Sequence, residues 1–200
     1  MNYVDYQRAK WNLANRETER QLGLGSVGSD LAAQIGCTTA SKPYMCVVGA
    51  MSTPLAQFAA MIQRLDHYAN QILPARLGAA NDQAMRNLIA ASKELLSSSR
   101  TLLSKAKTLQ GLLAKDAQFW DNWYMQVRAE WYAAEQAGGA GYDANALMRD
   151  AIAKIKSLVT TRAYPALDLA MGLAESGARV SAIIDASNVQ TAEDLTGQIQ

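Results

Sequence analysis

The sequence has few of the residues on which catalytic and metal-binding sites are built. Its 200 residues include two cysteines, Cys37 and Cys46, and one histidine, His67, and these three cannot complete a four-ligand zinc site by themselves. The C-x8-C spacing of the cysteines also differs from the C-x-x-C of redox proteins. No phosphate-binding loop, metalloprotease motif or nucleophile motif occurs. We therefore expect a non-enzymatic protein without a metal or a cofactor.

An excess of charge of either sign is also lacking. The chain has 19 basic and 18 acidic residues and a net charge of +1, whereas a domain that binds nucleic acid normally carries a strong basic excess. The N-terminal sequence lacks the apolar core of a secretory signal, and no uninterrupted apolar run is long enough to span a bilayer. Nucleic acid is therefore not an expected partner. We expect a protein without a signal peptide or ordinary transmembrane helix, cytoplasmic or incorporated in a particle or an envelope-associated assembly.

Proline is scarce, with four in the chain, while half of the residues are hydrophobic. Such a composition favours helix and excludes a disordered chain. No segment shows the two-residue alternation of a strand bounded by turns. The sequence therefore predicts an all-α fold, an elongated bundle of five to six main helices with a coiled-coil-like central pair.

The first helix of that central pair is expected before Pro74. Apolar residues recur there at alternating steps of three and four, the 3.5-residue spacing of coiled-coil packing. These residues are Leu55, Phe58, Ile62, Leu65, Ala69 and Ile72. Pro74 should kink or end the helix, and Asn81 or Asp82 should cap the next one. Further breaks are expected near Gly111, at the "GGAG" linker of residues 138–141, and before Pro165.

Glycine-rich stretches divide the chain into three expected parts. These are a polar helix and joint at 1–28, a main helical bundle at 29–137 that includes the cysteine loop, and C-terminal helices at 142–200 that pack on the bundle. The joint, "GLGSVG", matches the G-x-G-x-x-G of dinucleotide-binding turns. Because the charged, helix-prone "RETERQL" precedes it rather than a buried strand, a helix C-cap running into a joint is the favoured interpretation.

The second helix of the pair contains a seven-residue repeat, "SKELLSS", "SRTLLSK", "AKTLQGL". Leu88, Leu95, Leu102 and Leu109 form one row, and we expect this leucine row to lie in the core. Beside it runs a row of small residues with an adjoining basic line. That strip is the candidate contact for a partner helix, and it comprises Ser92, Lys93, Ser99, Arg100, Ala106 and Lys107. A solvated flank whose aliphatic stems cover the core edge is the favoured alternative for the basic line.

Cys37 and Cys46 enclose a short loop that a disulfide could close, stabilising the fold by about 3 kcal/mol in the loop-entropy model. A bridge would imply an oxidising compartment, whereas two reduced cysteines would fit the cytosol. The sequence leaves both states open. His67 falls outside the apolar seam of its helix and is expected at the surface.

Two further features concern burial or contact with a membrane. An aromatic helix around residues 115–136 places four aromatic side chains on one broad face, where they pack in the core or anchor an interface. These side chains are Trp120, Trp123, Tyr124 and Trp131. Residues 31–63 contain a single charge, Lys42, and are too rich in polar residues for an ordinary spanning helix.

These patterns favour a non-enzymatic helical structural or assembly subunit that acts through helix–helix contacts. Its expected partners are protein subunits, either copies of itself or others, in an oligomer. A virion component or a part of a secretion or conjugation machine would suit such a chain. The alternative is a membrane-active or channel-forming helical protein that inserts the low-charge segment 31–63. A catalytic or small-molecule pocket in the bundle ranks third.

Overall fold

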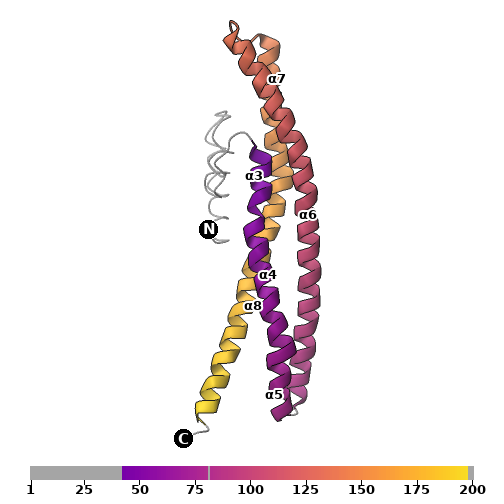
Figure 1. Cartoon of the computed structure of the whole chain (residues 1–200), viewed down its shortest axis with the longest axis vertical. Coiled ribbons are helices and arrows are strands. Elements are labelled where there is room, and N and C mark those ends of the chain that lie inside the picture. The colour runs from indigo at the N-terminus through magenta and orange to yellow at the C-terminus, as the bar shows by residue number, and fades with distance from the viewer. Residues whose placement is uncertain (1–41, 81, 198–200) are drawn as a thin grey trace. The chain divides into compact units, whose positions relative to one another are not determined.

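In the computed structural model, residues 42–80 and 82–197 are described, and these residues are mostly helical with no strand among them. The predicted all-α fold is confirmed. The helices follow one another in three long stretches (Figure 1). The first stretch comprises α3 (Pro43–Ala50), α4 (Ser52–His67), η1 (Tyr68–Ile72) and α5 (Leu73–Ala80). The second is α6 (Gln83–Gln136), and the third comprises α7 (Tyr142–Leu158), η2 (Val159–Ala163) and α8 (Tyr164–Gly197).

Among the described residues the expected break at Gly111 does not form; the expected total of five to six helices also counts residues outside the described ranges and stays a prediction. α6 is continuous for 54 residues, and Gly111 lies within it. A single glycine in a helix interior costs only about 1 kcal/mol relative to alanine, which the surrounding Ala, Leu and Lys residues outweigh. The start of α6 agrees with prediction, since Asp82 Oδ1 accepts the Ala84 backbone N–H at 3.0 Å.

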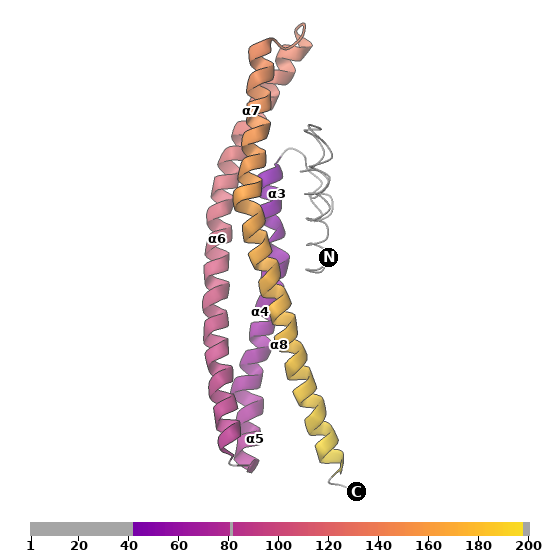
Figure 2. The same cartoon turned by 180° about the vertical axis from the view of Figure 1, so that it is seen from behind.

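Pro74 and Pro165 do not end helices either. Each follows a five-residue π-helical turn: η1 ends two residues before Pro74, and η2 ends two residues before Pro165. In both turns the backbone N–H of the next residue bonds the carbonyl five residues earlier. A proline removes one i→i−4 hydrogen bond and crowds the preceding turn, and a wider π turn supplies the extra room. The helix therefore continues through each proline, as the orange-to-yellow ribbon of α7, η2 and α8 shows (Figure 2).

The described residues form two compact units, each built from parts of all three stretches. The α3 unit comprises residues 42–52 and 108–171, and the α4 unit comprises residues 53–107 and 172–197. The polar helix and joint expected in residues 1–28 lie outside the described residues, and the three-part division stays a prediction. The expected linker between α6 and α7 is a turn in which Gly138 and Gly139 have φ of 133° and 99°, values that favour glycine.

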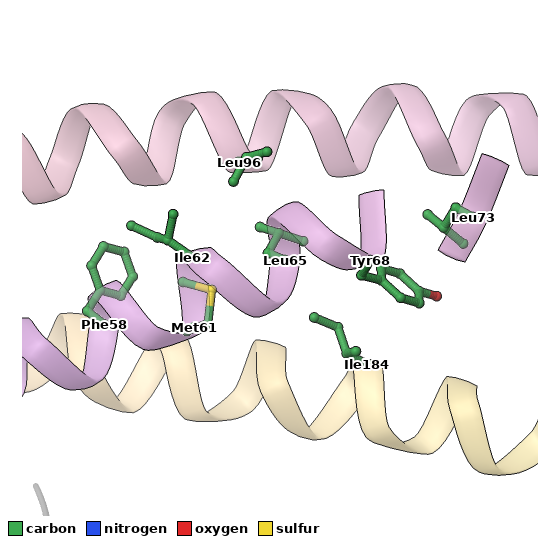
Figure 3. Close-up of a cluster of buried hydrophobic side chains, with 8 residues drawn as sticks. All are labelled: Phe58, Met61, Ile62, Leu65, Tyr68, Leu73, Leu96 and Ile184. Atoms are coloured by element: carbon green, nitrogen blue, oxygen red, sulfur yellow. The ribbon is translucent and has the colours of Figure 1, made fainter. Parts of the chain in front are cut away.

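The core of the α4 unit contains the predicted seam. Leu55, Phe58, Ile62, Leu65 and Ala69 are buried, and Ile72 packs against the same cluster. Figure 3 shows that α6 contributes a leucine to this cluster from one side and α8 an isoleucine from the other; these are Leu96 and Ile184.

α8 approaches α4 closely because it has a glycine at the contact. A Cβ added to Gly177 would lie 3.2 Å from Phe58 Cδ2 and 3.3 Å from Met61 Cβ. That spacing is tighter than ordinary van der Waals contact. Gly177 is therefore a packing residue of the α4 unit.

In the α3 unit, α3 packs against η2 and α7. Its tyrosine and valines are buried there, together with small and branched residues of the other helices. Among the largest fully buried side chains are Tyr44, Met51 and Leu167. One carboxylate, Asp121, is buried with them at 0% exposure, which raises the question of what satisfies it.

Candidate functional site

The buried face of α6 in the α4 unit is not the one expected from sequence. The small residues Ser92, Ser99 and Ala106 are 8%, 4% and 3% exposed, and Leu96 lies between them at 4%. The candidate partner strip is therefore split between interior and surface: its three small residues face the core of their own unit, and its three basic residues are exposed. The physical reason is volume: bulky side chains of α4 fill the core of the unit, and small residues on the facing side of α6 let the two helix backbones approach.

The expected core row is the exposed one. Leu88, Leu95 and Leu102 retain 44%, 43% and 48% of their accessible surface, so the prediction that this leucine row forms the core of the bundle is wrong for these three. Exposed residues beside the row complete what we call the open face of α6. The open face comprises Leu88, Ala91, Glu94, Leu95, Ser98, Leu102 and Lys105.

The basic line lies on the other flank of the buried face. Lys93, Arg100 and Lys107 are all exposed. Arg100 Nη2 lies 3.1 Å from Asp66 Oδ2 of α4, so this flank includes an ion pair within the unit. Both partners are about half exposed, and such a pair adds at most about 1 kcal/mol. The basic line therefore resembles the solvated flank that the sequence also allowed.

A buried polar site attaches α3 to α6. Lys42, which precedes α3, offers no side-chain cap. Instead Asp121 accepts two backbone N–H groups at the start of α3, from Tyr44 at 3.3 Å (Oδ1) and from Met45 at 2.8 Å (Oδ2). The carboxylate thus satisfies donors that a helix N-terminus leaves unpaired, at the positive end of the helix dipole. The sequence patterns did not single out Asp121; its only signal was an acidic residue inside an aromatic stretch.

A second carboxylate extends this attachment. The Tyr44 hydroxyl donates to Asp116 Oδ2 at 2.7 Å, and Arg162 Nη1 donates to the same oxygen at 2.7 Å. Burial opposes ionisation of Asp116, but the hydrogen bonds from Tyr44 and Arg162 outweigh it and lower its pKa. Burial is also the main cause of the raised pKa of Asp121, which the two backbone N–H groups oppose. For Tyr44, burial and the bond to Asp116 raise the pKa well above its ordinary value. These groups join α3, α6 and η2, and they serve structure.

The four predicted aromatic residues of α6 are half-buried in the α3 unit. Trp120 stacks edge-on against Trp123 at a centroid distance of 5.5 Å, and Lys154 Nζ lies 4.7 Å from the Trp120 ring centroid. Trp131 Nε1 donates to Asn145 Oδ1 at 2.8 Å. Tyr124 is half-buried as well. These contacts fit a packed aromatic face, whereas Phe119, which was not singled out, is 65% exposed.

Cys46 lies in α3 and is not a free thiol in this structure. Cys37 lies outside the described residues, so the Cys37–Cys46 bridge stays a prediction. Cys46 follows directly after the two backbone groups that Asp121 binds. A bridge at Cys46 and the carboxylate at Asp121 would therefore act on the same turn of α3.

His67 lies at the surface, beside a shallow hollow of the α4 unit that Arg64, Tyr68, Ile184 and Asn188 also line. The Tyr68 hydroxyl lies 2.8 Å from the Ser187 hydroxyl, and Arg64 forms an ion pair with Asp185. No nucleophile and orienting carboxylate adjoin the histidine among the residues that line this hollow. Within the described ranges no group of three or more His, Cys, Asp or Glu side chains is placed to hold a metal ion.

One stretch of the described residues, Pro43–Gly78, is long and apolar enough to cross a bilayer, with a mean hydropathy of 1.5 in its most apolar window. It includes residues 43–63 of the low-charge segment. Because 44% of that window is buried inside the protein, part of its apolar character is accounted for by the two cores. Length and composition alone leave membrane contact as a prediction.

Comparison with models of known protein families, with curated proteins and with solved structures found no match. The features that bear on function are therefore those of the chain itself. The described part of the structure holds no group of His, Cys, Asp or Glu side chains placed to bind a metal ion. It does present the open face of α6, which can do one thing chemically: bury apolar surface against another helix.

Proposed function

We propose that the chain is a non-enzymatic structural or assembly subunit that acts through helix–helix contacts, as an oligomer or within a larger particle. A virion or a secretion or conjugation machine is the kind of assembly that it would serve. The observation that carries the proposal is the exposure of the leucine row, with Leu88, Leu95 and Leu102 each about half exposed.

The spacing of these leucines is what distinguishes them from scattered surface residues. Isolated exposed leucines are normal on a protein surface, but these three recur every seventh residue along one helix. A seven-residue period keeps a row on one side of a helix and facing a partner helix. The row adjoins the buried small residues, so α6 is apolar over a wider arc than its contact with α4 requires.

The coiled-coil-like central pair belongs to the same proposal. The period of 3.5 in the buried residues of α4, and the steps from Ser92 through Leu96 to Ser99 on α6, support a pairing of that kind in the α4 unit. In this arrangement α6 uses one face for its own unit and keeps the leucine row for another subunit.

Light scattering coupled to size-exclusion chromatography tests the proposal on the purified full-length chain. We expect a mass above that of the 21.6 kDa monomer that increases with concentration. A monomer at every concentration would contradict self-assembly and leave contact with a different protein subunit as the form of the proposal to test next.

The second candidate is a membrane-active protein that inserts segment 31–63, favoured by the apolar stretch Pro43–Gly78. Insertion would remove buried residues such as Val48 and Leu55 from their cores, at a cost the bilayer would have to offset. Flotation with liposomes separates the two candidates: an assembly subunit stays at the bottom of the gradient, and a membrane-active protein floats.

A further inference from the structure

We propose that the open face of α6 binds the same face of a second copy of this chain, with the two helices antiparallel and a two-fold axis level with residue 100. This inference rests on the proposed assembly function and specifies its contact. Three observations carry it: the exposed leucines, the small residues beside them, and one acidic and one basic residue at a matching spacing.

Large and small side chains alternate on the open face in a way that suits self-pairing. In an antiparallel pair with its two-fold axis at residue 100, a residue that lies n positions before residue 100 is level with the residue n positions after residue 100 in the second copy. Leu102 of one copy then faces Ser98 of the second, and Leu95 faces the aliphatic stem of Lys105. In these two layers a large residue thus meets a small or extended one, which lets the helices interdigitate.

The charges select this register and direction. Glu94 lies six positions before the axis and Lys105 five positions after it, so the two side chains of different copies come within reach twice, once on each side of the axis. In a parallel pair the same residues would be 11 positions, or about 16 Å, apart along the helix axis. Sliding the antiparallel helices by one heptad separates the charges by six or more positions, about 9 Å.

A second copy matches this face better than a charged partner does. Glu94 and Lys105 are the two charged residues of the open face, and they cancel. A nucleic acid or an anionic membrane would call for a basic surface, whereas the basic line lies on the other flank of the buried face, where Arg100 is paired with Asp66. Self-complementarity is the property that a two-fold interface requires.

Charge reversal tests the contact with little risk to folding, because both residues are exposed. Glu94→Lys and Lys105→Glu should each weaken self-association, measured by sedimentation velocity, by on the order of tenfold in dissociation constant, since each variant makes two repulsive pairs. The double variant Glu94→Lys/Lys105→Glu should restore the wild-type constant. Lys93→Glu on the opposite flank is the matched control and should change it little.

Spin labels test the direction. A label on Ser98→Cys lies about 6 Å along the axis from its counterpart in the antiparallel pair, whereas a label on Ala90→Cys lies about 30 Å from its own. A parallel pair would give similar short distances at both positions. Double electron–electron resonance on each labelled full-length chain, with unmodified protein as the labelling control, distinguishes the two.

The outcomes separate this inference from the proposed function. Self-association that is unchanged by both charge reversals, or equal label distances at the two positions, overturns the antiparallel contact while assembly stands. A chain that remains monomeric at all concentrations overturns the contact and self-assembly together. Weakening by each reversal with recovery in the double variant supports the contact.

Discussion

Asp121 Oδ2 accepts the Met45 backbone N–H at 2.8 Å although the two residues are 76 positions apart in the chain. The cap of α3 therefore comes from the middle of α6 and not from the residue before the helix. Since α3 has eight residues, it is too short to be stable alone. Its position depends on Asp121 together with the packing of its buried residues.

Asp121→Asn should destabilise the protein by about 1–3 kcal/mol, because one of the two accepted hydrogen bonds is lost and an amide N–H then faces a backbone N–H. Urea unfolding followed by circular dichroism measures the change. Asp150→Asn, at an exposed position of α7, is the control and should stay within about 0.5 kcal/mol of the wild type. Equal effects of the two variants would show that Asp121 does not anchor α3.

Stability should depend on pH with opposite signs at the two carboxylates. The pKa of Asp116 is lowered in the folded state from its ordinary value of 3.8. Its contribution to the free energy of unfolding is therefore present above pH 3.8 and is lost as the pH falls through the lower folded pKa. The pKa of Asp121 is raised, so its protonation favours the fold at low pH, and this contribution is lost as the pH rises through the folded pKa.

The measurement for this pH dependence is the unfolding free energy of the wild type, Asp116→Asn and Asp121→Asn across acidic pH. The difference in unfolding free energy between the wild type and Asp116→Asn should decrease as the pH is lowered. The difference between the wild type and Asp121→Asn should increase as the pH is lowered. Parallel curves would contradict the assigned surroundings of the carboxylates.

Two glycines of α8 should respond oppositely to alanine. A Cβ at Gly172 meets nothing within 4 Å, so Gly172→Ala should stabilise the protein by about 0.5–1 kcal/mol through helix propensity. Gly177→Ala should destabilise it by about 1 kcal/mol or more, since the methyl group would press on Phe58 and Met61 and overpacking exceeds the propensity gain. Melting temperatures of the pair test this, and equal shifts would exclude a close α4–α8 contact.

Adjacent leucines of the repeat should behave differently. Leu96→Ala should cost about 2–5 kcal/mol, as expected for a buried leucine, because Leu96 is 4% exposed. Leu95→Ala should cost less than about 1 kcal/mol in dilute protein, since Leu95 is 43% exposed. Denaturant titration at low protein concentration keeps self-association out of the comparison. A large loss of stability in Leu95→Ala would show that the leucine row is part of the core.

Sequence patterns predicted the helices and the buried seam of α4 because one helix with one buried face is encoded by its own periodicity. They did not predict which row of α6 is buried. Both candidate rows share the seven-residue period, and hydrophobicity ranks leucine above serine. The choice depends on side-chain volume at the contact, where the small residues Ser92 and Ser99 are buried in the unit whose core the bulky side chains of α4 fill.

The attachment of α3 was beyond sequence reasoning for a different reason. Asp121 and Asp116 bind groups more than 70 positions away, and nothing in local spacing links them to Tyr44. The continuity of the helices through Pro74 and Pro165 was missed because the rule that proline ends a helix assumes an unbroken α-helical ladder. A π turn ahead of the proline interrupts that ladder and gives the proline ring room, so the helix continues.

Each π turn amounts to one inserted residue whose effect is confined to a single turn. An insertion into a plain α-helix would rotate every later side chain by about 100° around the axis, carrying core residues toward solvent. Here Leu65 before η1 and Leu73 after it are both buried in the α4 unit, so the helix has kept one inward face across the extra residue. Deleting one residue from η1 should therefore give a plain α-helical turn that keeps Leu73 on the buried face, whereas the same deletion elsewhere in α4 would rotate Leu73 away from the core.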